Sequence, residues 1–150
     1  MKITVLAIGR ARGAEAEWAA EYLKRLGPDV KVEEFTAPKS LPPDQTQKSE
    51  AHLLLRAIPE KNFVVLLDER GKDMGSRDFA ARLANWQEQF GDITFIIGGA
   101  DGVTDALRAK VNFTLGFGSL TWPHRLVRVM FLEQIYRARQ IIAGHPYHRD

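Results

Sequence analysis

The chain has no cysteine, no long apolar run and little net charge, and each absence limits the classes of protein to which it can belong. Without thiols, disulfides and thiolate metal sites are excluded, and residence in the reducing cytoplasm fits. No apolar run approaches the roughly 20 residues that cross a bilayer, and residues 1–9 are too short for a signal peptide. We therefore expect a cytoplasmic protein with no membrane association. The net charge of +2 does not by itself indicate a nucleic-acid partner.

Length and composition predict one globular domain with its own core. The 150 residues are the usual size of a single domain, and 45% apolar with 27% charged residues is ordinary for a soluble protein. No internal repeat, low-complexity tract or linker divides the chain. We expect residues 1–150 to form one domain.

Strand-like and helix-like segments alternate along the whole sequence. Apolar runs predict strands. The run 63–67 has no polar interruption, as in strands buried on both faces, and 93–97 is a second largely apolar run. Glycine or proline ends most of the helical segments. The expected strands are 2–8, 30–35, 63–67, 93–97 and 113–117, and the expected helices are 14–26, 44–57, 76–90, 105–110 and the segment after Pro123. The alternation predicts an α/β fold, a three-layer sandwich with a mostly parallel sheet.

Three strand ends are unusual, and ligands of open parallel sheets bind beyond the carboxyl ends of the strands. After the first, 63–67, alternating charges follow, and on spacing alone a solvated loop is the better interpretation. The second, 97–102, carries three glycines, so its backbone can approach a ligand closely. It lacks the dinucleotide fingerprint and the P-loop lysine, and a tight turn explains it about as well as a ligand loop.

The third strand end is the glycine-rich stretch 116–123. Its backbone N–H and C=O groups can read a base edge while Leu120 or Trp122 packs on the face of the base, although a flexible crossover has the same composition. None of the three ends decides a function alone. Their clustering at one edge of the sheet favours one small-molecule pocket.

The helix after Pro123 predicts an apolar stripe and a basic face. At 100° per residue, the three arginines Arg125, Arg128 and Arg139 gather nearly opposite the apolar residues. A solvated basic face is the usual outcome, and contact with RNA phosphates or a partner subunit is the alternative. The apolar stripe consists of Val127, Met130, Phe131, Ala138, Ile141 and Ile142.

The C-terminal tail combines groups that titrate near neutrality with a permanent cation. It holds His145, Tyr147, His148 and Arg149, although a frayed end is the alternative for residues so close to a terminus. Carboxylates and thiolates at zinc-ligand spacing are absent, so we expect no metal site.

Five motifs occur in an order that identifies a family. They are Leu67-Asp68 with Gly71-Lys72, then residues 95–102 (FIIGGADG), 120–129 (LTWPHRLVRV), 133–138 (EQIYRA) and 145–149 (HPYHR), and the opening residues 1–9 fit as well. Together they resemble the RlmH (YbeA-like) family of SPOUT methyltransferases along the whole chain. Each motif is weak alone, but the ordered combination is highly specific.

The resemblance implies a fold, a cofactor and a substrate. The fold is an α/β knot of the SPOUT type with a C-terminal trefoil knot, and S-adenosyl-L-methionine, the methyl donor, binds in the knot of a homodimer. The implied reaction is methylation at N3 of a pseudouridine in 23S ribosomal RNA of the assembled ribosome. A non-catalytic ribosome-associated binding factor on the same fold is the alternative, and S-adenosylmethionine binding would argue against it.

The resemblance also implies the site residues. The cofactor contacts carried over by motif are Leu67, Gly98, Phe117, Gly118, Ser119, Leu120, Thr121 and Trp122. They fall on the same three strand ends that the sequence pattern selected. Gly116 and Gly118 stand where the family more often has bulkier or serine residues, so backbone contacts are expected there. Near the target base we expect His124, Tyr147, His148 and Arg149, with Arg149 offsetting developing negative charge and the general base left open.

Overall fold

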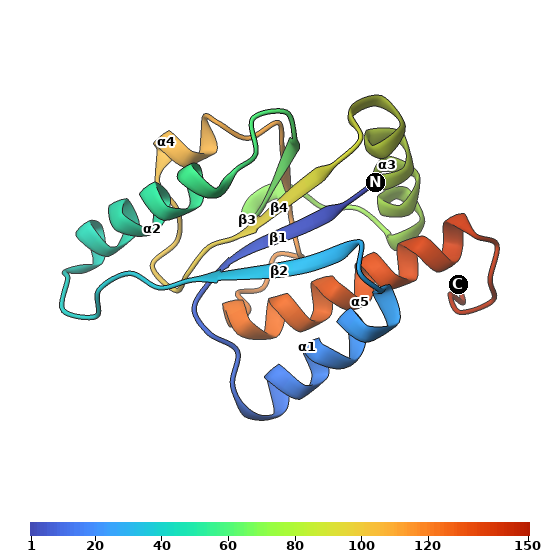
Figure 1. Cartoon of the computed structure of the whole chain (residues 1–150), viewed down its shortest axis with the longest axis horizontal. Coiled ribbons are helices and arrows are strands. Elements are labelled where there is room, and N and C mark those ends of the chain that lie inside the picture. The colour runs from blue at the N-terminus through green and yellow to red at the C-terminus, as the bar shows by residue number, and fades with distance from the viewer.

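The computed structural model describes all 150 residues, and strands and helices alternate as expected (Figure 1). The strands are β1 (Ile3–Ile8), β2 (Val30–Phe35), β3 (Phe63–Lys72), β4 (Ile93–Ile97) and β5 (Phe113–Leu115). The helices are α1 (Gly13–Leu26), α2 (Pro43–Ala57), α3 (Ser76–Phe90), α4 (Asp105–Arg108) and α5 (His124–Ile142). None of the helices combines the length and apolar character that a membrane crossing requires.

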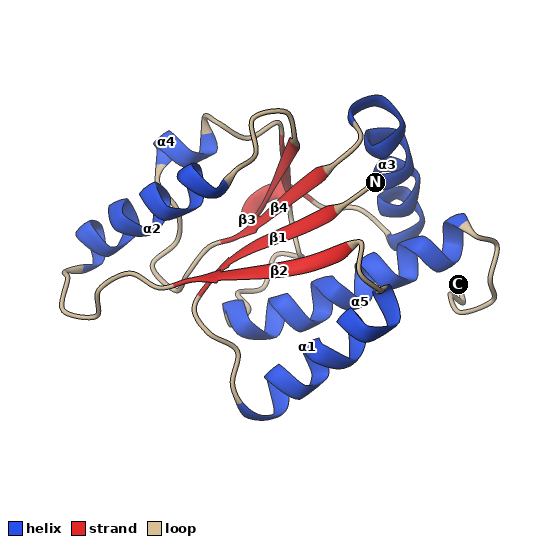
Figure 2. Ribbon diagram, in the orientation of Figure 1, coloured by secondary structure: helices blue, strands red, loops and turns tan.

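The five strands form one sheet in the order β2-β1-β4-β3-β5, and every pair is parallel. The register is even across the centre, where Ile3 lies opposite both Val30 and Ile93. Helices α1, α3 and α5 cover one face of the sheet, and α2 with α4 covers the other (Figure 2). The predicted three-layer α/β architecture is confirmed.

Alternate side chains of the central strands enter two separate cores. In β1, Ile3, Val5 and Ala7 point into the larger core beneath α1, α3 and α5, whereas Leu6 and Ile8 point toward α2 and α4. Because both faces are covered, nearly every position of these strands is apolar, with Thr4 and Thr94 as buried exceptions, which explains the long apolar runs in the sequence.

The two edge strands differ from the buried centre. Along β2 only Val30 is fully buried, and Lys31 pairs with Glu33 at 2.6 Å on the same strand. At the other edge, β5 has only three residues. The exposed side chains of β2 are therefore those of an edge strand.

Strand β3 is longer than predicted, because the chain crosses another segment there at very short range. Pairing with β5 is interrupted after Leu67 and resumes where Lys72 lies opposite Leu115. A Cβ added to Gly71 would overlap the backbone of Leu115, and a Cβ added to Gly116 would lie 2.7 Å from the carbonyl oxygen of Gly71. Residues 68–72 continue β3 and do not form a loop, but only Lys72 regains a partner in β5. Glu69, Arg70 and Lys72 are exposed, so the solvated character expected after Leu67 is kept.

Helix α5 buries a face that overlaps the predicted stripe only in part. It packs against both α1 and α3 over the sheet (Figure 1). Phe131 and Ala138 of the predicted stripe are buried, but Ile142 is 49% exposed. The other buried apolar residues of the helix are Val129, Leu132 and Ile135.

The predicted solvated basic face is wrong for Arg128, which is only 2% exposed. Its guanidinium donates to Glu34 Oε2 at 2.5 Å and to the carbonyl oxygen of Gly9 at 2.9 Å. These acceptors come from other elements, so helical periodicity gives no sign of them. Arg125 pairs with Glu15 at 3.2 Å, and Arg139 donates to the carbonyl oxygen of Leu26 at 3.0 Å.

The crossing at Gly71 generates a stability prediction. Gly71→Ala should lower the free energy of unfolding by roughly 1–3 kcal/mol, because the added methyl group has no room against backbone. Urea denaturation followed by circular dichroism measures the change. Gly75→Ala is the matched control, since no atom lies within 4 Å of its added Cβ and its φ is −73°, and it should cost less than about 1 kcal/mol. Equal losses in the two variants would contradict the tight crossing.

Candidate active site

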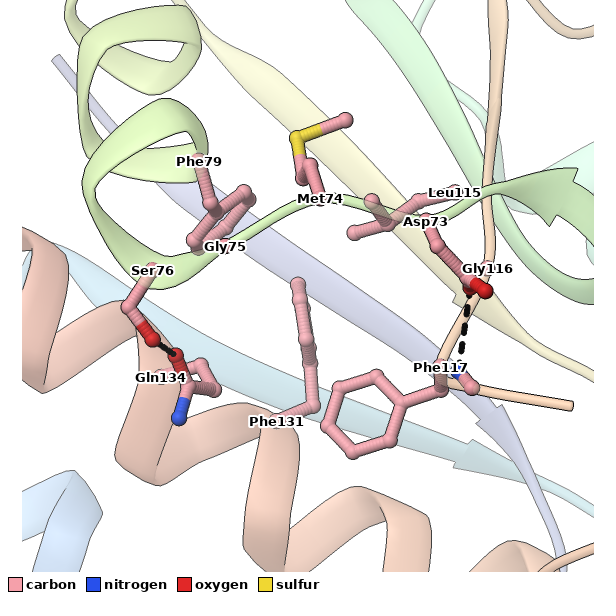
Figure 3. Close-up of a pocket in the computed structure, with 11 residues that line it drawn as sticks. Asp73, Met74, Gly75, Ser76, Phe79, Leu115, Gly116, Phe117, Phe131 and Gln134 are labelled. Carbon is pink, nitrogen blue, oxygen red and sulfur yellow. Dashed lines mark hydrogen bonds between the residues drawn. The ribbon is translucent and has the colours of Figure 1, made fainter. Parts of the chain in front are cut away.

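One cavity of about 530 Å³ lies beyond the carboxyl ends of β3 and β5 (Figure 3). Three segments enclose it: the connection from β3 to α3, the connection from β5 to α5, and the middle of α5. Its lining consists of Asp73, Met74, Gly75, Ser76, Phe79, Leu115, Gly116, Phe117, Gly118, Phe131 and Gln134. The cavity therefore lies at the edge of the sheet where ligands of parallel sheets bind.

Three aromatic rings form the apolar part of the cavity. Phe131 of α5 lies between the other two, with its ring centroid 5.8 Å from that of Phe79 and 6.4 Å from that of Phe117 (Figure 3). Leu115 and Met74 complete this surface. Such a lining accepts a planar, weakly polar ring system, because aromatic faces and edges pack against it over a large area.

Polar groups stand on two sides of the aromatic rings. The backbone N–H of Gly118 donates to Asp73 Oδ1 at 3.1 Å, and Ser76 Oγ donates to Gln134 Oε1 at 2.8 Å (Figure 3). Gly118 has φ +90°, a conformation that favours glycine, so the residue type fits this turn of the loop. The site combines a carboxylate, a hydroxyl and an amide around an apolar surface.

The predicted cofactor residues lie in different parts of the structure. Phe117 and Gly118 line the cavity, whereas Leu67 is buried in the larger core. Ser119, Leu120, Thr121 and Trp122 form the exposed continuation of the same loop, which the indole N–H of Trp122 closes by donating to the carbonyl oxygen of Phe117 at 3.1 Å. Gly98 belongs to the second glycine-rich loop, where it lies against Val103 and not in the cavity lining.

The second glycine-rich loop packs on a buried carboxyl group that the sequence analysis did not identify. Glu50 of α2 is 8% exposed, and its Oε1 has no hydrogen-bond partner. A Cβ on Gly99 would lie 2.9 Å from Glu50 Oε2, so any larger residue there would require the Glu50 carboxyl group to move. Burial and, to a lesser degree, the charge of Asp101 raise the pKa of Glu50. This arrangement explains one of the three glycines by packing.

His124 begins α5 and lies against the loop that follows β1. Its Nε2 is 3.3 Å from the position that a Cβ on Gly9 would occupy. Burial, followed by the positive charges of Arg125 and Arg128, lowers the pKa of His124, and Glu15 only partly opposes this. The imidazole is thus predominantly neutral at neutral pH and is able to accept a proton.

The C-terminal tail folds back along α5. Tyr147 donates its hydroxyl to Glu133 Oε1 at 3.0 Å, and His148 Nδ1 lies 3.1 Å from Arg137 Nη1. Burial and the Glu133 carboxylate raise the pKa of Tyr147 to about 12, so its hydroxyl stays protonated at neutral pH. Arg149 is exposed to solvent. A frayed tail, the alternative left open by the sequence, does not describe Tyr147 and His148.

The structure does not bring all four predicted catalytic residues together within one chain. Tyr147 contacts Glu133 and His148 contacts Arg137, one helical turn farther along α5. His124 lies at the start of the same helix. Glu133 follows His124 by roughly two and a half helical turns, which places it roughly 14 Å farther along the axis and on the opposite side of the helix.

Several lining residues were not predicted from the sequence. Phe131 was assigned to the core stripe, and periodicity cannot distinguish a core contact from a cavity wall. Asp73 directly follows the Gly71-Lys72 motif, and Gln134 lies within the EQIYRA motif, so the motif positions were the available signal. No group of three or more histidine, aspartate or glutamate side chains is arranged to hold a metal ion.

Comparison with known proteins gives full-length matches. The chain fits the family described as "Predicted SPOUT methyltransferase" over residues 1–148. It is 47% identical over 151 residues to the "Ribosomal RNA large subunit methyltransferase H" of Rhodospirillum centenum, with 99% of each chain covered. The protein of the same name from Paramagnetospirillum magneticum is 44% identical over 151 residues, again with 99% of each chain covered.

Solved structures share the fold at low sequence identity. A probable methylase family protein from Haemophilus influenzae has a TM-score of 0.58 at 13% identity, over 99% of this chain and 70% of that chain. The SpoU methyltransferase AviRb from Streptomyces viridochromogenes, solved in complex with AdoMet, has a TM-score of 0.51 at 16% identity, over 96% of this chain and 59% of that chain.

The motif resemblance is confirmed by these comparisons. The family match spans nearly the whole chain, and the relatives are more than 40% identical along their full length. The family match and the relatives indicate the same family, and the solved structure from Haemophilus influenzae has the same fold. This chain therefore belongs to the SPOUT methyltransferase family, in the same group as the relatives named ribosomal RNA large subunit methyltransferase H.

Proposed function

We propose that this protein methylates N3 of a pseudouridine in 23S ribosomal RNA and acts on the assembled ribosome. The observation that carries the proposal is the full-length similarity to relatives named ribosomal RNA large subunit methyltransferase H, joined to a cavity at the matching edge of the sheet. S-adenosylmethionine is the methyl donor of this enzyme. The alternative, a non-catalytic ribosome-associated factor, has no use for such a cavity.

The cavity fits the cofactor in size and chemistry. Its volume of about 530 Å³ is in the range of small-molecule sites. The partly exposed ring of Phe117 would contact the adenine ring, with the buried rings of Phe79 and Phe131 behind it, and Asp73 with Gln134 would hold polar groups of the ribose or the methionine part. When bound, S-adenosylmethionine supplies an electrophilic methyl group on a sulfonium. We assign the exposed loop 119–122 to the outer wall of the site.

Two of the proposed catalytic residues differ in the proton that they can handle. The N3–H of pseudouridine is a weak acid, so removal of its proton favours attack on a methyl group. His124 is neutral and able to accept this proton, whereas Tyr147, with a pKa of about 12, is a hydrogen-bond donor. Arg149 is a permanent cation suited to offset negative charge on the base. We therefore propose His124 as the general base.

The separation of these residues supports a homodimer. Because His124 and the tail lie on different sides of α5, we infer that the tail of one protomer faces His124 of its partner. Exposed large apolar side chains support association, since Leu120, Trp122 and Leu126 lie on the segment that enters α5 and Trp18 lies on the adjacent α1. We place the dimer in the cytoplasm, with the ribosomes that carry its substrate. The trefoil knot stays a prediction from family membership, supported by the close crossing at Gly71.

Incubation with ribosomes tests the proposed reaction. Ribosomes from a strain that lacks this protein should take up label from methyl-labelled S-adenosylmethionine, and nucleoside analysis should find it in N3-methylpseudouridine. Free ribosomal RNA is the control and should be labelled more slowly. Label in another nucleoside would show that the substrate is wrong while the methyl transfer is real.

The cavity assignment predicts a loss of cofactor affinity. Phe117→Ala should weaken S-adenosylmethionine binding roughly tenfold, or by about 1.4 kcal/mol, because it removes an aromatic wall of the cavity. Isothermal titration calorimetry measures this change. Phe90→Ala is the matched control, because Phe90 is a partly exposed phenylalanine of α3 that lies outside the cavity, and its affinity should not change. Equal affinities in all three proteins would place the cofactor elsewhere.

A mixing experiment tests the shared site. The variant His124→Ala and a chain truncated after Pro146 should each be inactive on ribosomes, yet both should fold. When the two are co-expressed, half of the dimers are mixed and each mixed dimer has one intact site, so activity should return to roughly a quarter of the wild-type value. No recovery, with mixed dimers shown by mass spectrometry, would mean that each site lies within one chain.

A further inference from the structure

A continuous chain of hydrogen bonds joins the cavity to the C-terminal tail. Ser76 Oγ donates to Gln134 Oε1 at 2.8 Å inside the cavity, and Gln134 Nε2 donates to Glu133 Oε2 at 3.0 Å. The other oxygen of Glu133 accepts the hydroxyl of Tyr147 at 3.0 Å. Ser76, Gln134, Glu133 and Tyr147 thus form one path from the cavity lining to the tail.

Glu133 is the branch point of this network. Besides Tyr147, its Oε1 accepts two bonds from Arg137, at 3.0 Å from Nε and 2.6 Å from Nη2. The remaining amino group of Arg137 contacts His148 Nδ1. The side chain of Glu133 is only 16% exposed, so these charge-assisted bonds are sheltered from solvent and fix the geometry better than a surface pair does.

A second connection joins the same two regions from the other side. Arg77 follows Ser76 in α3 and donates two hydrogen bonds to the carboxylate of Asp150, at 2.7 and 2.8 Å. Asp150 in turn lies 3.2 Å from His148 Nε2. Both imidazole nitrogens of His148 therefore have partners, one traced to α5 and one to the start of α3, which also borders the cavity.

The network differs from an ordinary surface cluster in what it joins. The residues at one end line the cavity, and the residues at the other end are those proposed to meet the target base. Gln134 uses both ends of its amide, the oxygen toward Ser76 and the nitrogen toward Glu133. A ligand that displaces the Ser76–Gln134 bond acts on the same amide whose nitrogen holds Glu133, the acceptor of Tyr147.

We propose that Glu133 is a positioning residue for Tyr147 and His148, and that Gln134 couples the occupancy of the cavity to the placement of the tail. The inference rests on the proposed function, because it assigns the cavity to S-adenosylmethionine and the tail to the target base. Cofactor binding then changes the placement of the groups that act on the RNA, so that the position of the tail depends on whether the methyl donor is bound.

Fluorine NMR of 3-fluorotyrosine-labelled protein tests both parts. The chain has three tyrosines, and the Tyr147→Phe variant identifies the resonance of Tyr147. We expect saturating S-adenosylmethionine to shift this resonance in the wild-type protein but not in Gln134→Ala. Glu133→Gln should shift it without cofactor and should lower kcat on ribosomes roughly tenfold, with both KM values within about twofold of wild type.

Glu33→Gln is the matched control. Glu33 also pairs with a cation, Lys31, at 2.6 Å, but on the edge strand β2. Its substitution should leave kcat and the Tyr147 resonance unchanged.

Three results would overturn the inference. They are an unmoved Tyr147 resonance in Glu133→Gln, a cofactor response of Gln134→Ala equal to that of the wild type, and calorimetric binding of S-adenosylmethionine to the wild type without any shift. Failure of S-adenosylmethionine to bind at all would instead reject the proposed function. In that case the Glu133→Gln spectrum still decides whether Glu133 positions the tail.

Discussion

The contact between the backbones at Gly71 and Gly116 is the constraint on which the site depends. Two connections, one leading from β3 to α3 and the other from β5 to α5, pass each other with no room for a side chain. Beyond the crossing they diverge, Asp73 accepts the N–H of Gly118, and the cavity opens between them. Any residue larger than glycine would separate the two walls, so the shape of the cavity is set by backbone and only then refined by side chains.

Helix α5 gathers the remaining functions on its different faces. One face carries Phe131 and Ile135 into the core, and Gln134 reaches the cavity. His124 lies at its start against the loop after β1, and Glu133 holds the returning tail. Packing between α1 and α3 gives this helix little freedom to move. Loops and tail are consequently the parts of the molecule that remain available for adjustment when a substrate binds.

The fold was predictable from the sequence because its signals are local. Long apolar runs identify strands covered on both faces. Pro123 directly before α5 and Gly144 shortly after it mark the two ends of this helix in the sequence. The site was predictable only in part. The burial of Arg128 depends on Glu34, and the extension of β3 places Asp68 where it pairs with Arg108 at 2.8 Å. Such partners come from distant segments, and no periodicity within one element reveals them. Phe131 shows the same limit, since its pattern indicates an inward side chain but not whether a core or a cavity lies inside.

The edges of the sheet restrict how two copies can meet. Strand β2 carries Lys31 and Glu33 along its open side, and β5 is too short to template a neighbour. Pairing of a second chain's strands with either edge of this sheet is therefore unfavourable. Assembly has to use helices and loops, which keeps the sheet of each protomer finite and leaves its backbone hydrogen bonds within one chain. Side-chain chemistry on the helical layer, and not main-chain pairing, then decides which surfaces recognise each other.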